Sequence, residues 1–211
     1  ADTYNVVINY VFSDHTIAAE PFVLTLEAGE DYNGTVTNPV LPGYEAYVGD
    51  DVNPSANTLI NVTNIQTNVQ ITVTYLPAIV NYRVRHYLQN ADNDNYTLDL
   101  EETLTGTTGT VVGDVEKDTY AGFYALLYEH PTIAADGSTI VEVYYDRYYF
   151  LMYFDLQGGT GVDPIYARYG SYVGSVSNPT KPGYSFGGWS QTVPTRVPLG
   201  NQTYTASWST V

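Results

Sequence analysis

The stretch FDLQGGTGVDPIYARYGSYVGSVSNPTKPGYSFGGW, residues 154–189, decides the fold of this chain. Gly158 and Gly159 interrupt its opening apolar alternation, and a second alternating run follows around Ile165. Turn residues then precede an aromatic run that ends at Trp189, and a last alternating segment, residues 204–208, closes the unit. Alternation with a period of two between Gly, Pro and Asn breaks is typical of strands, and no helical period occurs. The stretch therefore predicts a small unit built of strands.

The same plan occurs twice upstream. In the three copies an aromatic residue of the first strand precedes a Gly–aromatic step by 34, 36 and 30 residues, in the pairs Tyr10 and Tyr44, Tyr87 and Phe123, and Phe154 and Tyr184. An aromatic residue of the closing strand follows the same first-strand residue by 65, 58 and 54 residues, at Tyr75, Tyr145 and Trp208. A shared order with drifting loop lengths indicates tandem duplication.

We predict three β modules, residues 1–77, 78–147 and 148–211. Between Tyr75 and Val80 there is room for a tight turn only, and Asp146 and Arg147 form the whole connection to the third module. Flexible linkers are long and rich in Gly and Ser, and these connections are neither. We therefore expect strands to run nearly straight from one module into the next. The result would be an extended, semi-rigid rod whose modules contact only their neighbours.

Composition excludes several classes of partner. The chain has 211 residues and a formal net charge of -16, and its five Arg and two Lys cannot build a basic stripe that neutralises phosphates. This balance argues against nucleic acid and against an anionic membrane surface. No run approaches the roughly 20 apolar residues of a membrane span, and the N-terminal residues do not read as a signal peptide.

The absence of Cys means that packing alone must stabilise the modules. Units of this size bury only about 60% of the surface of the unfolded chain, so large aromatic cores are needed, and 22 Tyr can supply them. The net charge favours solubility and mutual repulsion. We expect a monomer, taken from a longer protein.

The third module resembles the internalin-type B repeat of bacterial surface proteins. The matching segments are residues 154–159, 169–170, 178–189 and 204–208, which include the motifs Asn-Pro-Thr-Lys-Pro-Gly-Tyr and Phe-Gly-Gly-Trp. The first module is similar to mucin-binding-protein (MucBP) repeats at residues 7–10, 41–44 and 71–75. The second resembles MucBP-like repeats at residues 84–87 and 143–147. One departure is that the first strand runs into Ser13-Asp14-His15-Thr16, which lacks the Gly of the Asp-x-x-Gly turn of MucBP repeats.

These resemblances imply a fold and a place in the cell. The fold would be mainly β and β-grasp-like, formally α+β with little helix, with a mostly antiparallel sheet. The protein would be an extracellular adhesin, or its stalk, on a Gram-positive cell, anchored to the wall through regions outside this chain.

Residues 90–95 resemble the start of a calcium-binding loop. Oxygen donors alternate at Asn90, Asp92 and Asp94, and Glu101 is the twelfth residue. However, Asn95 stands where an EF-hand needs Gly, and no flanking helices are predicted. A strand connection with Asx turns explains the same residues, so calcium remains an alternative.

No other pattern indicates chemistry. The residues His15, His86 and His130 lack metal-ligand spacing, and we expect His86 to be a half-buried or edge side chain of its strand. No Gly-x-Ser-x-Gly elbow occurs, and the neighbours Glu101 and Glu102 should face opposite sides of a strand. We therefore predict no enzyme activity and no catalytic, cofactor-binding or metal-binding residue.

The two lysines, Lys117 and Lys181, are the available donors for a Lys–Asn isopeptide crosslink, but Lys181 lies in a Pro-rich turn and should be exposed. Core positions are predicted for six rings: Tyr10, Tyr75, Tyr87, Tyr145, Trp189 and Trp208. The dense aromatic group at residues 144–150 cannot all point inward. Its outward members are predicted to pack at the junction of the second and third modules and to stiffen it.

Two functions of different classes follow. The first is a non-enzymatic structural and adhesive segment, a stalk. The second is a module that binds glycans or mucin through exposed Tyr and acidic side chains, with host or microbial surface proteins as further partners. An accessory segment of a secreted enzyme is a third alternative.

Overall fold

The computed structural model describes residues 2–211, and these residues form strands and loops without a helix. The prediction of a mainly β fold is therefore confirmed. The strands are β1 (Thr3–Phe12), β2 (Ile17–Glu27), β3 (Tyr32–Thr37), β4 (Tyr44–Val48), β5 (Asn57–Val62), β6 (Val69–Pro77), β7 (Ile79–Gln89), β8 (Tyr96–Thr107), β9 (Phe123–Ala125), β10 (Ile140–Arg147), β11 (Tyr149–Asp155), β12 (Ile165–Arg168), β13 (Tyr184–Trp189) and β14 (Gln202–Thr210).

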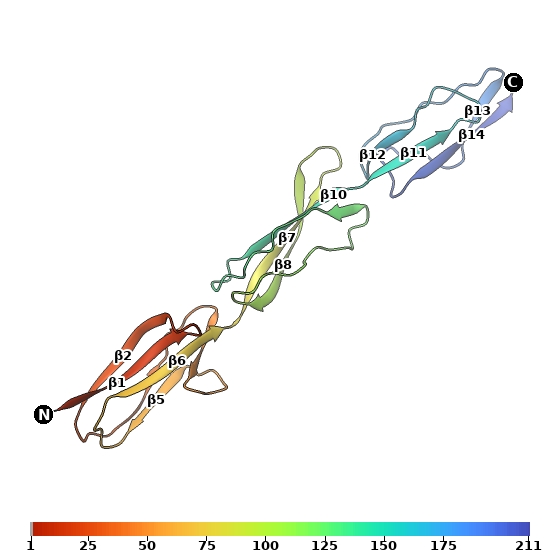
Figure 1. Cartoon of the computed structure of the whole chain (residues 1–211). Coiled ribbons are helices and arrows are strands. Elements are labelled where there is room, and N and C mark those ends of the chain that lie inside the picture. Colours follow the sequence, from red (N-terminus) through yellow and green to blue (C-terminus); the bar gives the residue numbers. More distant parts are fainter. Residues whose placement is uncertain (1) are drawn as a thin grey trace. The chain divides into compact units, whose positions relative to one another are not determined.

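Three four-stranded sheets share one strand order. The orders are β2-β1-β6-β4, β8-β7-β10-β9 and β12-β11-β14-β13, so the first and last strands of each set lie at the centre. Figure 1 shows β1 between β2 and β6 in the first sheet. In the first and third sheets this central pair is parallel and the two outer pairings are antiparallel. The first segment has an additional antiparallel pair, β3 with β5. The small sheets thus occur in tandem, as expected of repeats.

The core of the first sheet follows the alternation of its sequence. Val6, Ile8 and Tyr10 point inward from β1, and Val73 and Tyr75 point inward from β6. The rings of Tyr10 and Tyr75 meet edge to face at 6.3 Å. The Tyr75 hydroxyl donates to the carbonyl of Pro39 at 2.7 Å, and burial raises the pKa of Tyr75 to about 12. Both tyrosines are core residues, as predicted.

The middle sheet corrects two predictions. Tyr82, Val84 and His86 form the inner face of β7, and His86 is fully buried rather than half-buried. Tyr87 was expected in the core, but it lies on the opposite face and stacks on Tyr144 at 4.8 Å. The reason is the period of two in a strand, since Tyr87 shares its face with the arginines at positions 83 and 85. The prediction for Tyr145, fully buried on β10, is confirmed.

The third sheet buries Met152, Phe154 and Tyr204. Trp189 and Trp208 were predicted as core residues, but both are half-buried. Trp189 packs against Phe154 at 5.3 Å, and the indole N–H of Trp208 donates to the carbonyl of Leu156 at 2.9 Å. A large indole whose N–H needs an acceptor is more easily placed at the margin of so small a core.

The chain divides into two compact units. One comprises the residues up to Arg83 together with Thr103–Gly113 and His130–Thr139, and the other comprises Val84–Glu102, Asp114–Glu129 and Ile140–Val211. The module boundaries at 77/78 and 147/148 and the extended rod stay predictions. Within residues 2–211 there is no helix of the length and hydropathy that a membrane crossing requires.

Candidate functional site

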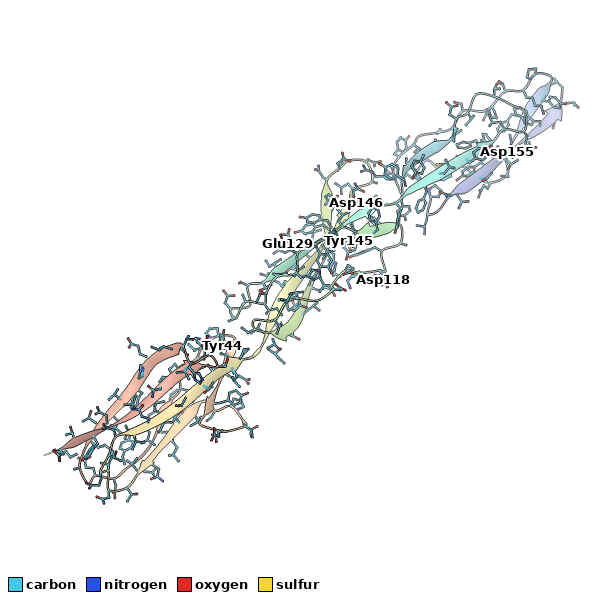
Figure 2. The ribbon with its side chains drawn as sticks, viewed as in Figure 1. Tyr44, Asp118, Glu129, Tyr145, Asp146 and Asp155 are labelled. Carbon is cyan, nitrogen blue, oxygen red and sulfur yellow. The ribbon has the colours of Figure 1, made fainter. Side chains whose placement is uncertain are left out.

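A single residue separates the closing strand of each of the first two sheets from the strand that follows. β6 ends at Pro77 and β7 begins at Ile79, while β10 ends at Arg147 and β11 begins at Tyr149. We call Ala78 and Tyr148, which lie between these strands, the joint residues. Asp146 and Arg147, predicted to form the second connection, instead belong to β10. Figure 2 shows Asp146 next to Tyr145 on that strand.

At the first joint, both backbone groups of Ala78 are hydrogen-bonded. Its N–H donates to the carbonyl of Gly43 at 2.9 Å, and its carbonyl accepts from the N–H of Thr108 at 3.0 Å. The Thr108 hydroxyl lies 2.9 Å from the Gly43 oxygen and 3.1 Å from the Ala78 oxygen. The joint therefore ties the turn before β4 to the segment after β8.

The second joint repeats these bonds. The N–H of Tyr148 donates to the carbonyl of Gly122 at 2.9 Å, and the Tyr148 carbonyl accepts from the N–H of Tyr169 at 2.7 Å. Gly122 precedes β9 as Gly43 precedes β4, and Tyr169 follows β12 as Thr108 follows β8. A residue bonded through both its N–H and its carbonyl leaves little freedom in the connection.

Two separate features of both turns favour glycine, the backbone conformation and the space available for a side chain. Gly43 and Gly122 have φ values of +79° and +83°, which L side chains rarely adopt. A Cβ on Gly43 would also lie 2.4 Å from the carbonyl oxygen of Ala135, and one on Gly122 would lie 2.4 Å from Cδ2 of Tyr169. A larger residue at either turn would therefore have to displace the backbone at Ala135 or the ring of Tyr169.

Arg147 adds side-chain contacts at the second joint. Its Nε donates to the carbonyl of Gln89 at 2.7 Å, and its Nη1 donates to the carbonyl of Tyr169 at 3.0 Å. The guanidinium lies 4.7 Å from the centre of the Phe123 ring, a cation–π distance. Burial lowers the pKa of Arg147. Hydrogen bonds between a charged donor and carbonyls are stronger than neutral ones, so this side chain stabilises the joint.

The aromatic group around this joint follows the prediction for one of its outward members. Tyr148 lies 4.8 Å from Tyr124 of β9, measured between ring centres, whereas Tyr144 and Tyr149 pair with rings of their own sheets, Tyr87 and Tyr166. That this packing stiffens the connection stays a prediction.

The loop at residues 90–95 contacts the segment around β12. Asp92 accepts from the N–H of Tyr172 at 2.8 Å and from Arg196 at 3.1 Å. Asp94 pairs with Arg168 at 2.7 Å. The same guanidinium donates to the carbonyls of Asn93 at 2.6 Å and of Asn90 at 3.3 Å. The loop is thus held to the third sheet through two arginines.

These contacts bear on the calcium alternative. The carboxylates of Asp92 and Asp94 are engaged by arginines, and Glu101, the expected twelfth ligand, pairs with Arg85 at 2.9 Å. Among residues 2–211 no group of three or more His, Cys, Asp or Glu lies close enough together to hold a metal ion. The Asx turn favoured as the other explanation is present, because the N–H of Asn95 donates to the side chain of Asn93.

Hydrogen bonding shifts two acid groups near the loop. The N–H of Tyr172, followed by Arg196, lowers the pKa of Asp92. The hydroxyl of Tyr96, which follows the loop, donates to Asp146, and this bond with burial raises the pKa of Tyr96 to about 12. Asp92 is therefore charged, and Tyr96 neutral, across the physiological range.

An open cleft of 820 Å³ lies between this loop and the third sheet. Three of its tyrosines are well exposed: Tyr149, Tyr166 and Tyr172. Tyr149 and Tyr166 face each other with ring centres 5.4 Å apart. Arg168, Arg196 and Asp92 supply charged groups to the same wall. The cleft combines aromatic faces with hydrogen-bonding groups.

His86 is the centre of a buried polar network. Its Nδ1 lies 2.8 Å from the Tyr145 hydroxyl, and its Nε2 lies 2.5 Å from Glu102. The Tyr145 oxygen accepts from the N–H of Lys117 at 2.8 Å, so its own proton is available to Nδ1 and Nε2 donates to Glu102. Burial works against the charge of Glu102, but hydrogen bonds from His86 and Lys117 outweigh it and lower the pKa of Glu102.

The other two histidines have separate surroundings. His15 lies in an exposed turn with φ of +70°, and His130 bonds the carbonyl of Val112 at 3.0 Å. Glu101 and Glu102 face opposite sides of β8, as predicted, because one pairs with Arg85 and the other with His86.

Neither lysine contacts an Asn side chain in the described contacts. Lys117 Nζ lies 3.3 Å from Glu102, and Lys181 donates to the carbonyl of Gln157 at 3.0 Å. Lys181 also lies 4.3 Å from the centre of the Tyr184 ring. Sequence reasoning missed the roles of Arg168 and Arg196. The only available signal was that arginine is scarce in a strongly acidic chain.

Comparison with known proteins gives one family match. The model of the Listeria-Bacteroides repeat domain matches residues 150–207, which span β11 to most of β14. No match to the chain was found among curated proteins. Among solved structures the chain is similar to the Bacillus anthracis TIE protein, with 8% identity and a TM-score of 0.42 over 98% of this chain and 51% of that chain. The chain spans about half the length of that structure.

Residues 150–207 therefore fit a repeat of bacterial surface proteins. This agrees with the resemblance noted for the third module at the level of a surface repeat, and it indicates an extracellular location.

Proposed function

We propose that the chain is a non-enzymatic structural and adhesive segment, a stalk, of a Gram-positive cell-surface protein. The match at residues 150–207 supports a surface repeat. In this proposal the third module is an internalin-type B repeat, the first two are MucBP-like, and regions outside the chain anchor it to the cell wall. Its task is to hold other parts of the protein away from the cell.

One observation supports this function above all, namely that the same joint is built twice. In both joints one residue separates two strands, and both of its backbone groups are hydrogen-bonded. A flexible Gly/Ser linker spans roughly 5–6 Å times the square root of its length and samples all directions. A fully bonded single residue cannot do so. Modules joined in this way form the extended, semi-rigid rod that a spacer needs.

The proposal is tested by NMR relaxation of the whole chain. We expect amides of the third sheet and of the adjoining part of the middle sheet, residues 84–102, to report one common tumbling time. Inserting eight Gly and Ser residues after Tyr148 should uncouple them. The control places the same insertion between Asp51 and Val52, in an exposed loop of the first segment. If the two regions already tumbled with different times in the native chain, as in the chain with the insertion after Tyr148, the result would contradict a spacer.

The cleft beside the second joint favours a second function, glycan binding. Tyr149, Tyr166 and Tyr172 expose ring faces there, and such faces stack on the apolar faces of sugars while neighbouring charged groups bond sugar hydroxyls. This function is compatible with a stalk that carries a weak adhesive face.

A glycan array that includes mucin-type sugars, probed at high protein concentration, separates the two functions. Binding that is lost in Tyr166→Ala but kept in Tyr153→Ala would support the cleft, since Tyr153 is also exposed on the third sheet but lies outside the cleft. If the native chain bound no sugar, the spacer would be the only one of the two functions still supported.

A further inference from the structure

The third sheet has the same glycine turn as the first two. The register of the last antiparallel pair in each sheet places Tyr44 opposite Pro77, Phe123 opposite Arg147, and Tyr184 opposite Thr210. Val211 therefore occupies the position of the joint residues. Its N–H donates to the carbonyl of Gly183 at 3.2 Å, as Ala78 donates to Gly43 and Tyr148 to Gly122. Gly183 has φ of +82°, matching the two other turns.

What differs is the covering of this turn. Later parts of the chain cover the turns at Gly43 and Gly122: a Cβ on Gly43 would lie 2.4 Å from the carbonyl oxygen of Ala135, and one on Gly122 would lie 2.4 Å from Cδ2 of Tyr169. At Gly183, apart from the glycine itself and its two chain neighbours, no atom of the described residues lies within 4 Å of that Cβ position. Val211 is 94% exposed and Tyr184 is 41% exposed. The third turn is half of a joint without its cover.

The complementary half is present at the other end of the chain. In both joints a later residue, Thr108 at the first and Tyr169 at the second, donates its N–H to the carbonyl of the joint residue. The first segment makes the same bond, from the N–H of Ala28 to the carbonyl of Asp2 at 2.9 Å. The following Gly29 donates to the carbonyl of Ile65 at 2.8 Å, and its counterparts after Thr108 and Tyr169 make the corresponding bonds at the same distance, to Ile133 and Val197.

We infer that the face formed by Gly183, Tyr184 and Val211 is a docking surface for the N-terminal end of another module of this fold. The end formed by Asp2, Ala28 and Gly29 has the matching bonds. The inference rests on the proposed spacer function and deepens it by naming the partner of the uncovered turn. In the docked state Val211 takes the place of Asp2, so that one residue again separates two strands.

The test joins two copies of the chain so that Thr3 of the second directly follows Val211 of the first. Segmental isotope labelling makes only the first copy visible by NMR. In a matched control, eight Gly and Ser residues are inserted after Val211, so that Val211 is internal to both chains. We expect the Val211 amide to exchange with solvent at least about tenfold more slowly in the direct fusion, because docking buries its bond to Gly183. Gly183→Ala in the first copy should remove that difference.

Equal exchange of Val211 in the two fusions would overturn the inference, as would slow exchange that survives the insertion. Tryptophan fluorescence of both fusions checks that the third sheets are folded, because Trp189 and Trp208 lie there. Failure here is distinct from failure of the spacer function, which is read at Tyr148 in the single chain. A rigid Tyr148 joint with an unprotected Val211 would overturn only the docking surface.

Discussion

His86 takes in the middle sheet the position that Tyr10 takes in the first. Both point inward from the first strand of their sheet toward a buried tyrosine of the last strand, Tyr145 or Tyr75. In the middle sheet this position thus holds a ring that bonds Tyr145 and Glu102, whereas Tyr10 meets Tyr75 edge to face. The middle core therefore depends on a polar network where its neighbour depends on apolar packing.

Replacing His86 by Leu should destabilise the middle sheet by about 2–3 kcal/mol, because the buried Tyr145 hydroxyl loses its acceptor and the half-buried Glu102 loses a donor. Tyr87→Leu, on the opposite face of the same strand, should cost about 1 kcal/mol for the lost ring contact with Tyr144. Native-state hydrogen exchange of the slowest amides of β7 and β10 measures the loss of stability in each variant. Equal costs would contradict the importance of the network.

The sequence contains enough information to predict that His86 is buried. Arg83 and Arg85 alternate with Tyr82 and Val84, and continuing that period to His86 assigns it to the core. The prediction instead followed the aromatic side chain, and so selected Tyr87. The partners of His86 were not predictable, because Glu102 and Tyr145 lie 16 and 59 residues away in the chain.

At the scale of elements, the loop at residues 90–95 shows which contacts hold one sheet to the next. Arg168 makes two kinds of bond with it, to backbone carbonyls and to the carboxylate of Asp94. The guanidinium side chain is 16% exposed, whereas the Asp94 side chain is 91% exposed. Exposed ion pairs contribute little, while hydrogen bonds from a charged, partly buried donor contribute more.

We therefore expect Arg168→Ala and Asp94→Ala to differ. Loss of Arg168 should raise the opening equilibrium of the loop by about tenfold or more, and loss of Asp94 should change it by less than about twofold. Hydrogen exchange of the amides at residues 90–95 measures the opening. A large effect of Asp94→Ala would mean that the ion pair, not the carbonyl bonds, holds the loop.

Asp92 makes the same contact sensitive to acid. The Tyr172 N–H and Arg196 lower its folded-state pKa below the ordinary value of 3.8. Its contribution is therefore complete above pH of about 4 and is lost as the pH falls through the folded-state pKa. We expect the amide chemical shift of Tyr172 to titrate below the usual Asp range, and Asp92→Asn to abolish that titration. A titration at or above pH 4 would contradict the assignment.

Strands and turns were largely predictable, because alternation and Pro-Gly steps are local signals. The loop contacts were not. For residues 90–95 a strand connection with Asx turns was predicted, with oxygen donors for calcium as the alternative. The cations that they bind are Arg168 and Arg196, which lie 74 and 104 residues away from their partners, and no local pattern could show this.

At the scale of the whole molecule, three glycine turns offer a comparison made by the chain itself. Gly43, Gly122 and Gly183 have φ values within a few degrees of each other, so alanine meets the same backbone strain at each. Only the first two are covered by a following segment. The difference in stability cost between Gly→Ala at a covered turn and Gly→Ala at Gly183 therefore measures what the covering contributes.

Gly183→Ala should cost about 1 kcal/mol, which is the usual penalty for an L residue at positive φ. Gly43→Ala and Gly122→Ala should each cost about 2–4 kcal/mol, because the added methyl also displaces the covering segment. Native-state hydrogen exchange measures each sheet separately through its slowest amides. Equal costs at all three positions would show that the coverings add nothing to stability.

Repetition was the feature of the whole molecule that the sequence revealed best, since the same intervals recur three times. The position of the connections was less accurate, because Asp146 and Arg147 extend β10 and leave Tyr148 as the joint residue. The Gly–aromatic steps were noticed as landmarks. Only the backbone contacts show that the glycine of each turn is bonded to the joint residue that leads into the next strand.

The two bonds that each joint residue makes through its own N–H and carbonyl go to backbone atoms of the turn and of the covering segment. Neighbouring repeats can therefore drift apart in sequence and still fit, provided that the turn keeps its glycine. A recombination event that cut the gene at this codon would deliver units with compatible ends. Bacteria could lengthen or shorten such a protein without inventing a new interface each time.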